Sequence, residues 1–178
     1  TLDDAIGEAF DKCGKTMGFD YPAGPIIDKY SKNGNQKKFK FPIPKVKGLD
    51  FSFSGFKTSV LNFINKNINL DQNFIKNNVE DLCASIQFTL IEILMLKINL
   101  AVRKTGITQI ALGGGVAANS ELRKRIIHEG EKNNLKTYIP NIDYTTDNAA
   151  MIALVGYLKY KNLHLGNLKQ KALSNYKI

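Results

Sequence analysis

The chain contains no tryptophan, three methionines and two cysteines among its 178 residues. Two cysteines 70 residues apart exclude a disulfide scaffold and a CxxC zinc cluster. Cys13 and Cys83 both lie in helix-like surroundings, so we expect small core residues in a reducing compartment. Long uncharged runs are also missing, because the longest apolar run, residues 86–102, contains Glu92 and Lys97. A spanning helix needs about 20 nearly uncharged residues, so we expect no membrane span.

The chain does not begin with methionine, and no basic segment followed by an apolar one opens it. We therefore expect no signal peptide, and a chain that begins inside a longer protein. Thr1, Asp3 and Asp4 are typical of a helix start, with Thr1 as the candidate cap. Hydrophobic residues make up 43% and charged residues 23%, which excludes a disordered chain and predicts a folded core.

Acidic residues are missing from two segments. Residues 29–49 carry seven lysines and no acid, and residues 148–178 carry five lysines and no acid. The net charge is +9, so the rest of the chain sums to −3. A basic segment of this kind can follow a phosphate backbone. However, 22 of the 25 basic residues are lysine, whereas phosphate sites favour arginine forks. Charge alone therefore leaves nucleic-acid contact and compositional bias open.

Hydrophobic periodicity predicts a helix-rich α/β chain. Helices are expected at residues 3–17, 26–31, 56–67, 73–104, 119–133 and 145–160. Strands are expected at residues 49–54, 107–112 and 136–139, with an extended loop over residues 33–48. The helix at 73–104 is apolar almost all round, which predicts a place at the domain centre, and Gly106 is its expected C-terminal cap. Residues 107–139 run strand, glycine loop, helix, strand, the order of a parallel sheet.

The glycine loop Gly113-Gly114-Gly115 is the first candidate site. It follows a strand expected to be buried, and a helix begins within a few residues. Glycines let a ligand approach the backbone, and a helix N-terminus offers N–H groups to an anion or a ribose. Ligands of open parallel sheets bind at this end of the strands. The alternative is a tight turn with Asn119 as N-cap, although three glycines are more than a turn needs.

Asp147 is the second candidate. It is either the N-cap of the following helix or a carboxylate facing the cleft, where it would hold a metal or a substrate hydroxyl. Asp11, judged alone, is expected to pair with Lys15 at the surface. His128 and His164 match no metal-ligand spacing. We therefore expect neither a metal site built from this chain alone nor a self-contained hydrolase.

Five segments together resemble the TsaD/Gcp family, the tRNA N6-adenosine threonylcarbamoyltransferases formerly described as O-sialoglycoprotein endopeptidases. They occur in the family's order and at similar spacing, and the resemblance covers about residues 2–160. The last 18 residues carry no motif. The segments are DAIGEAFDK from Asp4, YPAGP from Tyr21, GLDFSFSGFKT from Gly48, GGGVAAN from Gly113 and TDNAAM from Thr146.

The resemblance implies the second half of an actin/Hsp70/sugar-kinase-like fold (ASKHA, ribonuclease H-like), which has two lobes around a nucleotide cleft. The family's N-terminal half, with its HxxxH metal pair, is absent from this sequence. Within the chain, residues 1–48 are expected to form a helical subdomain with the basic loop. Residues 49–178 are expected to form an α/β nucleotide-binding lobe.

The resemblance also implies roles for individual residues. Asp11, Gly24 and Asn119 match substrate or nucleotide contacts, and Asp28 matches a contact that only some members have. Asp147 matches the carboxylate that completes a divalent metal site, with iron or else zinc, whose two histidines lie outside this chain. No catalytic residue is assigned within the chain.

The implied reaction moves a threonylcarbamoyl group from threonylcarbamoyl-adenylate to N6 of the adenosine beside the tRNA anticodon. Implied partners are tRNA and other proteins of the modification machinery, including a paralogous actin-like protein and a small ATPase, in the cytoplasm and without a membrane. We expect this chain alone to be inactive. A lobe of an ASKHA-fold kinase and a non-catalytic docking module are the alternatives, and residues 50–58 favour the transferase over the kinase.

Overall fold

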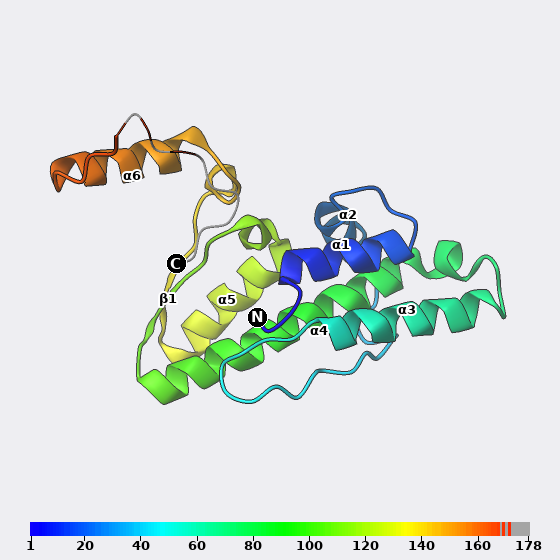
Figure 1. The fold of residues 1–178 in the computed structure, drawn as a ribbon. Coiled ribbons are helices and arrows are strands. Elements are labelled where there is room, and N and C mark those ends of the chain that lie inside the picture. The colour runs from blue at the N-terminus through cyan, green and yellow to red at the C-terminus, as the bar shows by residue number, and fades with distance from the viewer. Residues whose placement is uncertain (168, 170, 172–178) are drawn as a thin grey trace. The chain divides into compact units, whose positions relative to one another are not determined.

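The computed structural model describes residues 1–167, 169 and 171 of the chain (Figure 1). It is a helix-rich α/β chain with a small parallel sheet, as expected. The chain forms two compact units, of which the first covers Thr1–Thr145 and the second begins at Thr146. The elements, with η for a 3-10 helix, are α1 (Ile6–Thr16), α2 (Gly24–Ser31), α3 (Ser54–Ile68), α4 (Phe74–Thr105), β1 (Gln109–Ala111), η1 (Gly115–Ala118), α5 (Ser120–Asn133), β2 (Lys136–Tyr138), η2 (Ile142–Tyr144) and α6 (Ala149–Lys161).

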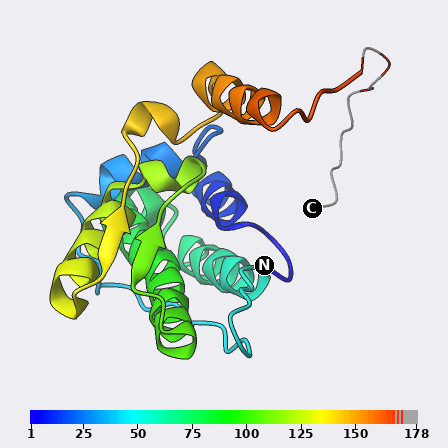
Figure 2. The same ribbon diagram turned by 90° about the vertical axis from the view of Figure 1, so that its left-hand side faces the viewer.

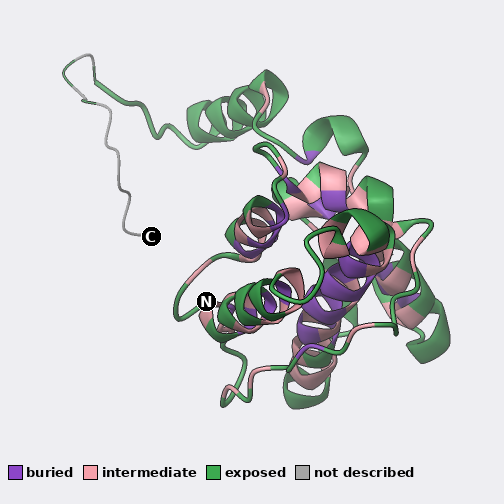
Figure 3. Ribbon diagram, turned by 90° about the vertical axis from the view of Figure 1, so that its right-hand side faces the viewer, coloured by how far each residue is buried: buried purple, intermediate pink, exposed green. Residues whose placement is uncertain are grey.

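Helix α4 forms the centre of the first unit, as its all-round apolar sequence predicts (Figure 3). Helices α1, α2, α3 and α5 pack against it and bury an unbroken run of its residues from Leu82 to Gln87. By length and composition α4 is also able to cross a membrane, a test that core helices of folded domains pass as well. One hydrophobic core joins α1 and α2 to α3 and α4. The subdomain boundary expected after residue 48 stays a prediction.

The segment before α3 differs from the expected strand. Residues 49–53 form no strand, and α3 begins at Ser54. The cause is Asp3, whose carboxylate accepts hydrogen bonds from Ser52 Oγ at 2.6 Å and from the N–H of Phe53 at 2.8 Å. Phe53 is the N-cap of α3 and has no acceptor on its own side chain, and Asp3 accepts instead from the N–H groups of Phe53 and Ser54 at the start of the helix.

Helix α1 begins later than expected, at Ile6, and without Thr1 as its cap. The hydroxyl of Thr1 donates instead to the carbonyl of Asp4 at 2.8 Å. The carboxylate of Asp4 lies 2.8 Å from Lys12 Nζ and 3.2 Å from Lys57 Nζ, which ties the start of α1 to α3. The acidic start of the chain therefore serves packing between α1 and α3.

Strands β1 and β2 lie side by side and pair in parallel, with Ile110 opposite Thr137 (Figure 2). The expected strand, helix and strand unit is confirmed. The expected burial of β1 is wrong, because Gln109 and Ala111 are exposed and Ile110 is only half-buried. Both strands alternate exposed, intermediate and exposed residues, so one face of this sheet packs inward and the other is open.

Two helix ends decide the position of candidate residues. Gly106 closes α4 in the left-handed conformation at φ 69°, as expected. In the second unit, α6 begins at Ala149 rather than at residue 145. Its N-cap is Asn148, whose side chain accepts a hydrogen bond from the N–H of Met151 at 3.0 Å. The interpretation of Asp147 as the N-cap is therefore wrong.

Candidate functional site

The carboxylate of Asp11, on α1, binds the start of α2. Its Oδ1 accepts hydrogen bonds from the N–H of Ala23 at 2.8 Å and of Gly24 at 3.3 Å. Ala23 is the N-cap of α2 and has no side-chain acceptor, so Asp11 satisfies N–H groups that the helix leaves free. The expected pair with Lys15 is wrong, since no ion pair joins the two side chains in the described residues. Asp11 and Gly24 are thus in direct contact.

Asp28, on α2, reaches the start of α5. Its carboxylate accepts a hydrogen bond from Ser120 Oγ at 2.7 Å, and both its oxygens lie within 3.3 Å of the backbone N of Ser120. A negative charge at a helix N-terminus is favoured by the helix dipole. This contact places Asp28 beside Asn119, the residue that precedes Ser120.

Asn119 caps α5 and also bonds to α4. Its Oδ1 accepts a hydrogen bond from the N–H of Leu122 at 3.0 Å, so the capping interpretation is confirmed. Its Nδ2 donates to Oε1 of Gln87 at 2.7 Å. Gln87 in turn donates from Nε2 to Ser31 Oγ, also at 2.7 Å. A chain of polar side chains therefore joins α2, α4 and α5.

Sequence reasoning missed Gln87 and Ser31. A signal for Gln87 was present, because it is an uncharged polar residue between Ile86 and Phe88 at the start of the most apolar part of α4. A buried amide needs hydrogen-bond partners, so a glutamine at this place predicts a buried polar contact. Ser31 carries no comparable signal, since serine at a helix end is common.

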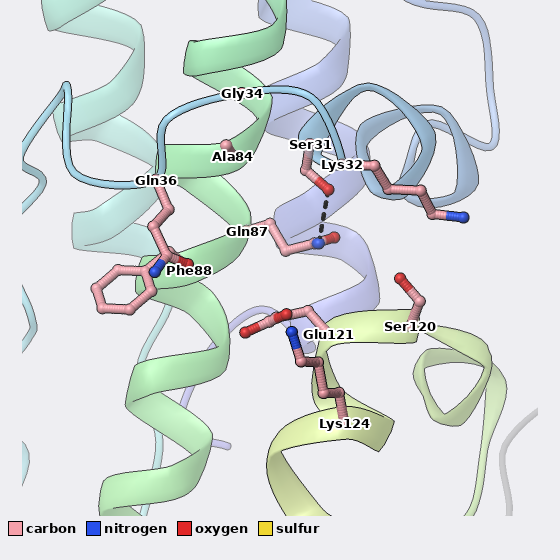
Figure 4. Close-up of a pocket in the computed structure, with 10 residues that line it drawn as sticks. All are labelled: Ser31, Lys32, Gly34, Gln36, Ala84, Gln87, Phe88, Ser120, Glu121 and Lys124. Carbon is pink, nitrogen blue, oxygen red and sulfur yellow. Dashed lines mark hydrogen bonds between the residues drawn. The ribbon is translucent and has the colours of Figure 1, made fainter.

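A pocket of about 360 Å³ lies beside this polar chain. Figure 4 shows Ser31 and Gln87 joined by their hydrogen bond, with Ser120, Glu121 and Lys124 of α5 next to them. Its lining is mostly polar and combines charges of both signs with one aromatic ring, so it suits a polar ligand. The lining residues are Ser31, Lys32, Gly34, Gln36, Ala84, Gln87, Phe88, Ser120, Glu121 and Lys124.

A wider and more open hollow of about 750 Å³ lies along α1 and includes Asp11. The Lys12 ammonium in its wall is held by Asp4 at 2.8 Å and by Glu8 at 2.6 Å. The hydrogen bond to Asp4, followed by that to Glu8, raises the pKa of Lys12, so this ammonium stays protonated while the two carboxylates offset its charge. The lining residues are Gly7, Glu8, Asp11, Lys12, Lys15, Phe19, Asp20 and Tyr21.

The glycine loop is open. A Cβ added to Gly113, Gly114 or Gly115 would meet no atom within 4 Å, so close packing does not explain these glycines. Gly114 has φ 83° and requires glycine for its backbone, and η1 starts at the next residue. η1 contacts α1, the helix that carries Asp11. The loop therefore offers an accessible backbone near the candidate residues.

Asp147 belongs to the second unit and is exposed. No cluster of three or more His, Cys, Asp or Glu side chains able to hold a metal occurs among the described residues. Catalytic metal sites usually have three protein ligands. The residues described here therefore do not fit a metal site by themselves.

Fold and site together define a helix-rich α/β chain with a small parallel sheet, in which candidate residues gather around the starts of α2 and α5 and an open glycine loop precedes η1. The chain belongs to the TsaD family, tRNA N6-adenosine threonylcarbamoyltransferase, whose sequence profile matches residues 1–154.

Curated relatives that carry this name are similar to the chain along nearly all of its length. Identity is 51% over 177 residues with the protein of Christiangramia forsetii, 52% over 178 with that of Riemerella anatipestifer and 47% over 182 with that of Thermosipho africanus. These alignments cover 99%, 100% and 100% of this chain but only 52%, 52% and 53% of the relatives. The chain thus spans about half the length of the curated relatives that it matches.

Proposed function

We propose that the full-length protein containing this chain transfers a threonylcarbamoyl group from threonylcarbamoyl-adenylate to N6 of the adenosine beside the tRNA anticodon. N6 attacks the carbamoyl carbon, the bond from that carbon to the phosphate oxygen breaks, AMP leaves, and N6 gives up one proton. The observation that carries this proposal is the similarity, over 99% of the chain, to a relative named for this activity.

In this proposal the chain is the second half of a two-lobed ASKHA fold. The open face of the β1–β2 sheet supports a covering neighbour, because an antiparallel sheet tolerates one wet face but a parallel sheet is normally covered on both. Helix α6, described by itself, supports the same view, because its Ile152 and Leu154 are 69% and 59% exposed. The remaining half of the protein would supply the cover.

Asp11, Gly24, Asp28 and Asn119 would contact the nucleotide part of the adenylate, near the glycine loop 113–115. The two carboxylates are suited to accept hydrogen bonds from ribose hydroxyls. Oδ1 of Asp11 takes both N–H groups from α2, while its Oδ2 accepts no hydrogen bond within the described part of the chain. Asn119 already uses its Oδ1 and one Nδ2 hydrogen in the fold, which leaves the second Nδ2 hydrogen for a ligand.

Asp147 would contribute one carboxylate to a divalent metal, iron or zinc, whose histidine ligands lie outside this chain. A single exposed carboxylate binds such a metal weakly, so we propose that the 178-residue chain alone lacks transfer activity. Stoichiometric metal binding of micromolar affinity by this chain alone, measured by calorimetry, would contradict this. The proposal also includes the cytoplasm as location, and as partners tRNA, a paralogous actin-like protein and a small ATPase.

Substitutions of two neighbouring residues allow one experiment to distinguish a loss of activity from a loss of stability. Asp147→Ala in the full-length protein removes the proposed metal ligand but no helix cap, so it should abolish tRNA modification and leave the melting temperature nearly unchanged. Asn148→Ala removes the cap of α6 and should cost about 0.5–2 kcal/mol of stability while modification continues. The measurement pairs thermal melting with modification of transcribed tRNA by the assembled machinery.

The opposite pattern counts against the site. If Asp147→Ala modifies tRNA at a near-normal rate, the assignment of this carboxylate fails. For the nucleotide contacts, Asn119→Ala should weaken adenylate binding even under conditions where the variant protein is still fully folded. A variant that melts earlier but binds the adenylate normally would reduce Asn119 to a structural residue.

A further inference from the structure

We propose that the exposed lysines of residues 29–47, here called the lysine ribbon, bind the phosphate backbone of RNA. The inference rests on the proposed function in taking RNA as the partner, and it adds where that partner is held. All the members are exposed and no acidic residue interrupts them. The members of the lysine ribbon are Lys29, Lys32, Lys37, Lys38, Lys40, Lys45 and Lys47.

The charge of the lysine ribbon is largely uncompensated. Lys38 forms an ion pair with Asp81 at 2.6 Å. The other six members take part in no ion pair with any residue that the structure describes. Six free ammonium groups on a short segment are able to neutralise phosphates of a nucleic acid and so release the counterions that those phosphates hold. Release of these counterions is the main source of non-specific affinity for nucleic acids.

The backbone of the ribbon is held in place although most of it lies outside any helix or strand. The N–H of Asn35 donates to Asp81 at 2.7 Å. The rings of Phe39 and Phe41 both pack on Phe63, with centroids 5.3 and 5.4 Å away. These contacts fix the middle of the ribbon to α3 and α4.

The far end of the ribbon is fixed by another lysine. Lys97, on α4, donates from Nζ to the carbonyl of Val46 at 2.8 Å and to that of Gly48 at 2.7 Å. Because the backbone is already ordered at both places, binding a partner costs less conformational entropy than it would for a mobile loop.

The lysines alternate with side chains that turn to the core. Lys38 and Lys40 are exposed, whereas Phe39 between them is half-buried and Phe41 is buried. At this place the ribbon therefore turns ammonium groups outward and two aromatic rings inward.

The chemistry of the lysine ribbon fits a phosphate backbone rather than base edges. Contacts to phosphates position a nucleic acid without reading its sequence, and lysine provides them as a point charge. No arginine occurs between residues 29 and 47. Phe39 and Phe41 face the core. Tyr30 and Ile43 are 38% and 40% exposed beside the lysines, so an anionic membrane is the competing partner that the test must separate from RNA.

The test compares two triple variants of the full-length protein that remove the same charge. The ribbon variant is Lys40→Gln, Lys45→Gln and Lys47→Gln. The control variant is Lys66→Gln, Lys104→Gln and Lys132→Gln, which alters exposed lysines of α3, α4 and α5. The probes are a transcribed tRNA that carries the target adenosine and, separately, phosphatidylserine vesicles.

We expect the ribbon variant to bind the tRNA roughly tenfold or more weakly near 0.1 M salt, and its slope of log K against log salt to fall by about 2–3. Its KM for tRNA should rise, while adenylate affinity and the melting temperature stay at the values of the control. The control variant should bind the tRNA much as the unmodified protein does.

Two results would overturn the lysine ribbon as an RNA surface. Equal loss of tRNA affinity in both variants would point to overall charge, and loss of vesicle binding with normal tRNA binding would point to a membrane. In either case the proposed transferase function stands. Failure of the unmodified protein, with its machinery, to modify tRNA from the adenylate would instead overturn the proposed function itself.

Discussion

The side-chain amides of Asn119 and Gln87 bond to each other across the interface between α5 and α4, with Nδ2 of Asn119 2.7 Å from Oε1 of Gln87. Only 9% of Asn119 and 4% of Gln87 are exposed. Because buried amides must find partners, this pair fixes the start of α5 on α4. The end of η1 and Ser120, which flank Asn119, are positioned by the same contact.

Removing the amide of Gln87 should therefore cost stability. Gln87→Met keeps the side-chain length but takes away the acceptor of Asn119 Nδ2 and the bond to Ser31 Oγ, which keeps only its bond to the carbonyl of Asp28. We expect a loss of about 1–3 kcal/mol in the free energy of unfolding. Gln72→Met is the control, because Gln72 is exposed and should change stability by less than about 0.5 kcal/mol. Urea denaturation of both variants measures the difference. Equal midpoints would show that the amide pair adds nothing.

Local patterns predicted the helices and the parallel unit well. Apolar periodicity placed α4 and α5, and Gly106 marked the end of α4, because these features depend on neighbouring residues only. The irregular segment before α3 was taken for a strand because its apolar and polar residues alternate. Its conformation is set by Asp3, about 50 residues away, and no local pattern contains that partner.

The candidate site shows the same division. Asn119 as a cap is local and was predicted, whereas the contact of Asp11 with the start of α2 and that of Asp28 with Ser120 join separate elements. Asp11 was expected to pair with Lys15, four residues along the helix. The carboxylate instead binds backbone N–H groups that the fold brings to it, a choice that only the packing of α1 on α2 decides.

Asp3 should contribute to the way the free energy of unfolding falls at acid pH. The hydrogen bond from Ser52, followed by that from the N–H of Phe53, lowers the pKa of Asp3 from 3.8 to about 2. A carboxyl whose pKa is lowered by folding stabilises the fold above its unfolded pKa and loses this effect as pH falls through its folded pKa. The contribution of Asp3 is therefore complete above about pH 4 and disappears towards about pH 2.

The Asp3→Asn variant makes this measurable. Its urea midpoint should be lower than that of the unmodified protein near neutral pH, and the two should converge as the pH falls from 4 towards 2. Asp50→Asn alters an exposed carboxylate on the same segment and should leave the profile unchanged. Parallel profiles for Asp3→Asn and the unmodified protein would show that Asp3 is not ionised preferentially in the fold.

Cys13 and Cys83 should resist alkylation in the folded protein. Both thiols are free and buried, as sequence predicted, and burial raises the pKa of each to about 12. The thiolate is the reactive form, so almost none is present at neutral pH. Peptide mass spectrometry after iodoacetamide treatment should find both cysteines unmodified in buffer and modified in urea. Modification of either thiol in buffer at the rate seen in urea would contradict its burial.

Gly14 keeps α1 close enough to α2 for Asp11 to bind Ala23 and Gly24. A Cβ on Gly14 would lie 2.2 Å from Cβ of Ala23, so Gly14→Ala must push the two helices apart. We expect a loss of about 1–3 kcal/mol in stability, typical of overpacking, together with weaker adenylate binding by the full-length protein. The matched change Gly55→Ala lies in α3, where a Cβ would meet nothing within 4 Å. Because alanine favours helix over glycine, Gly55→Ala should be neutral or stabilise by up to about 1 kcal/mol. If the two variants unfold at the same urea concentration, the close packing of α1 on α2 is not what requires glycine at position 14.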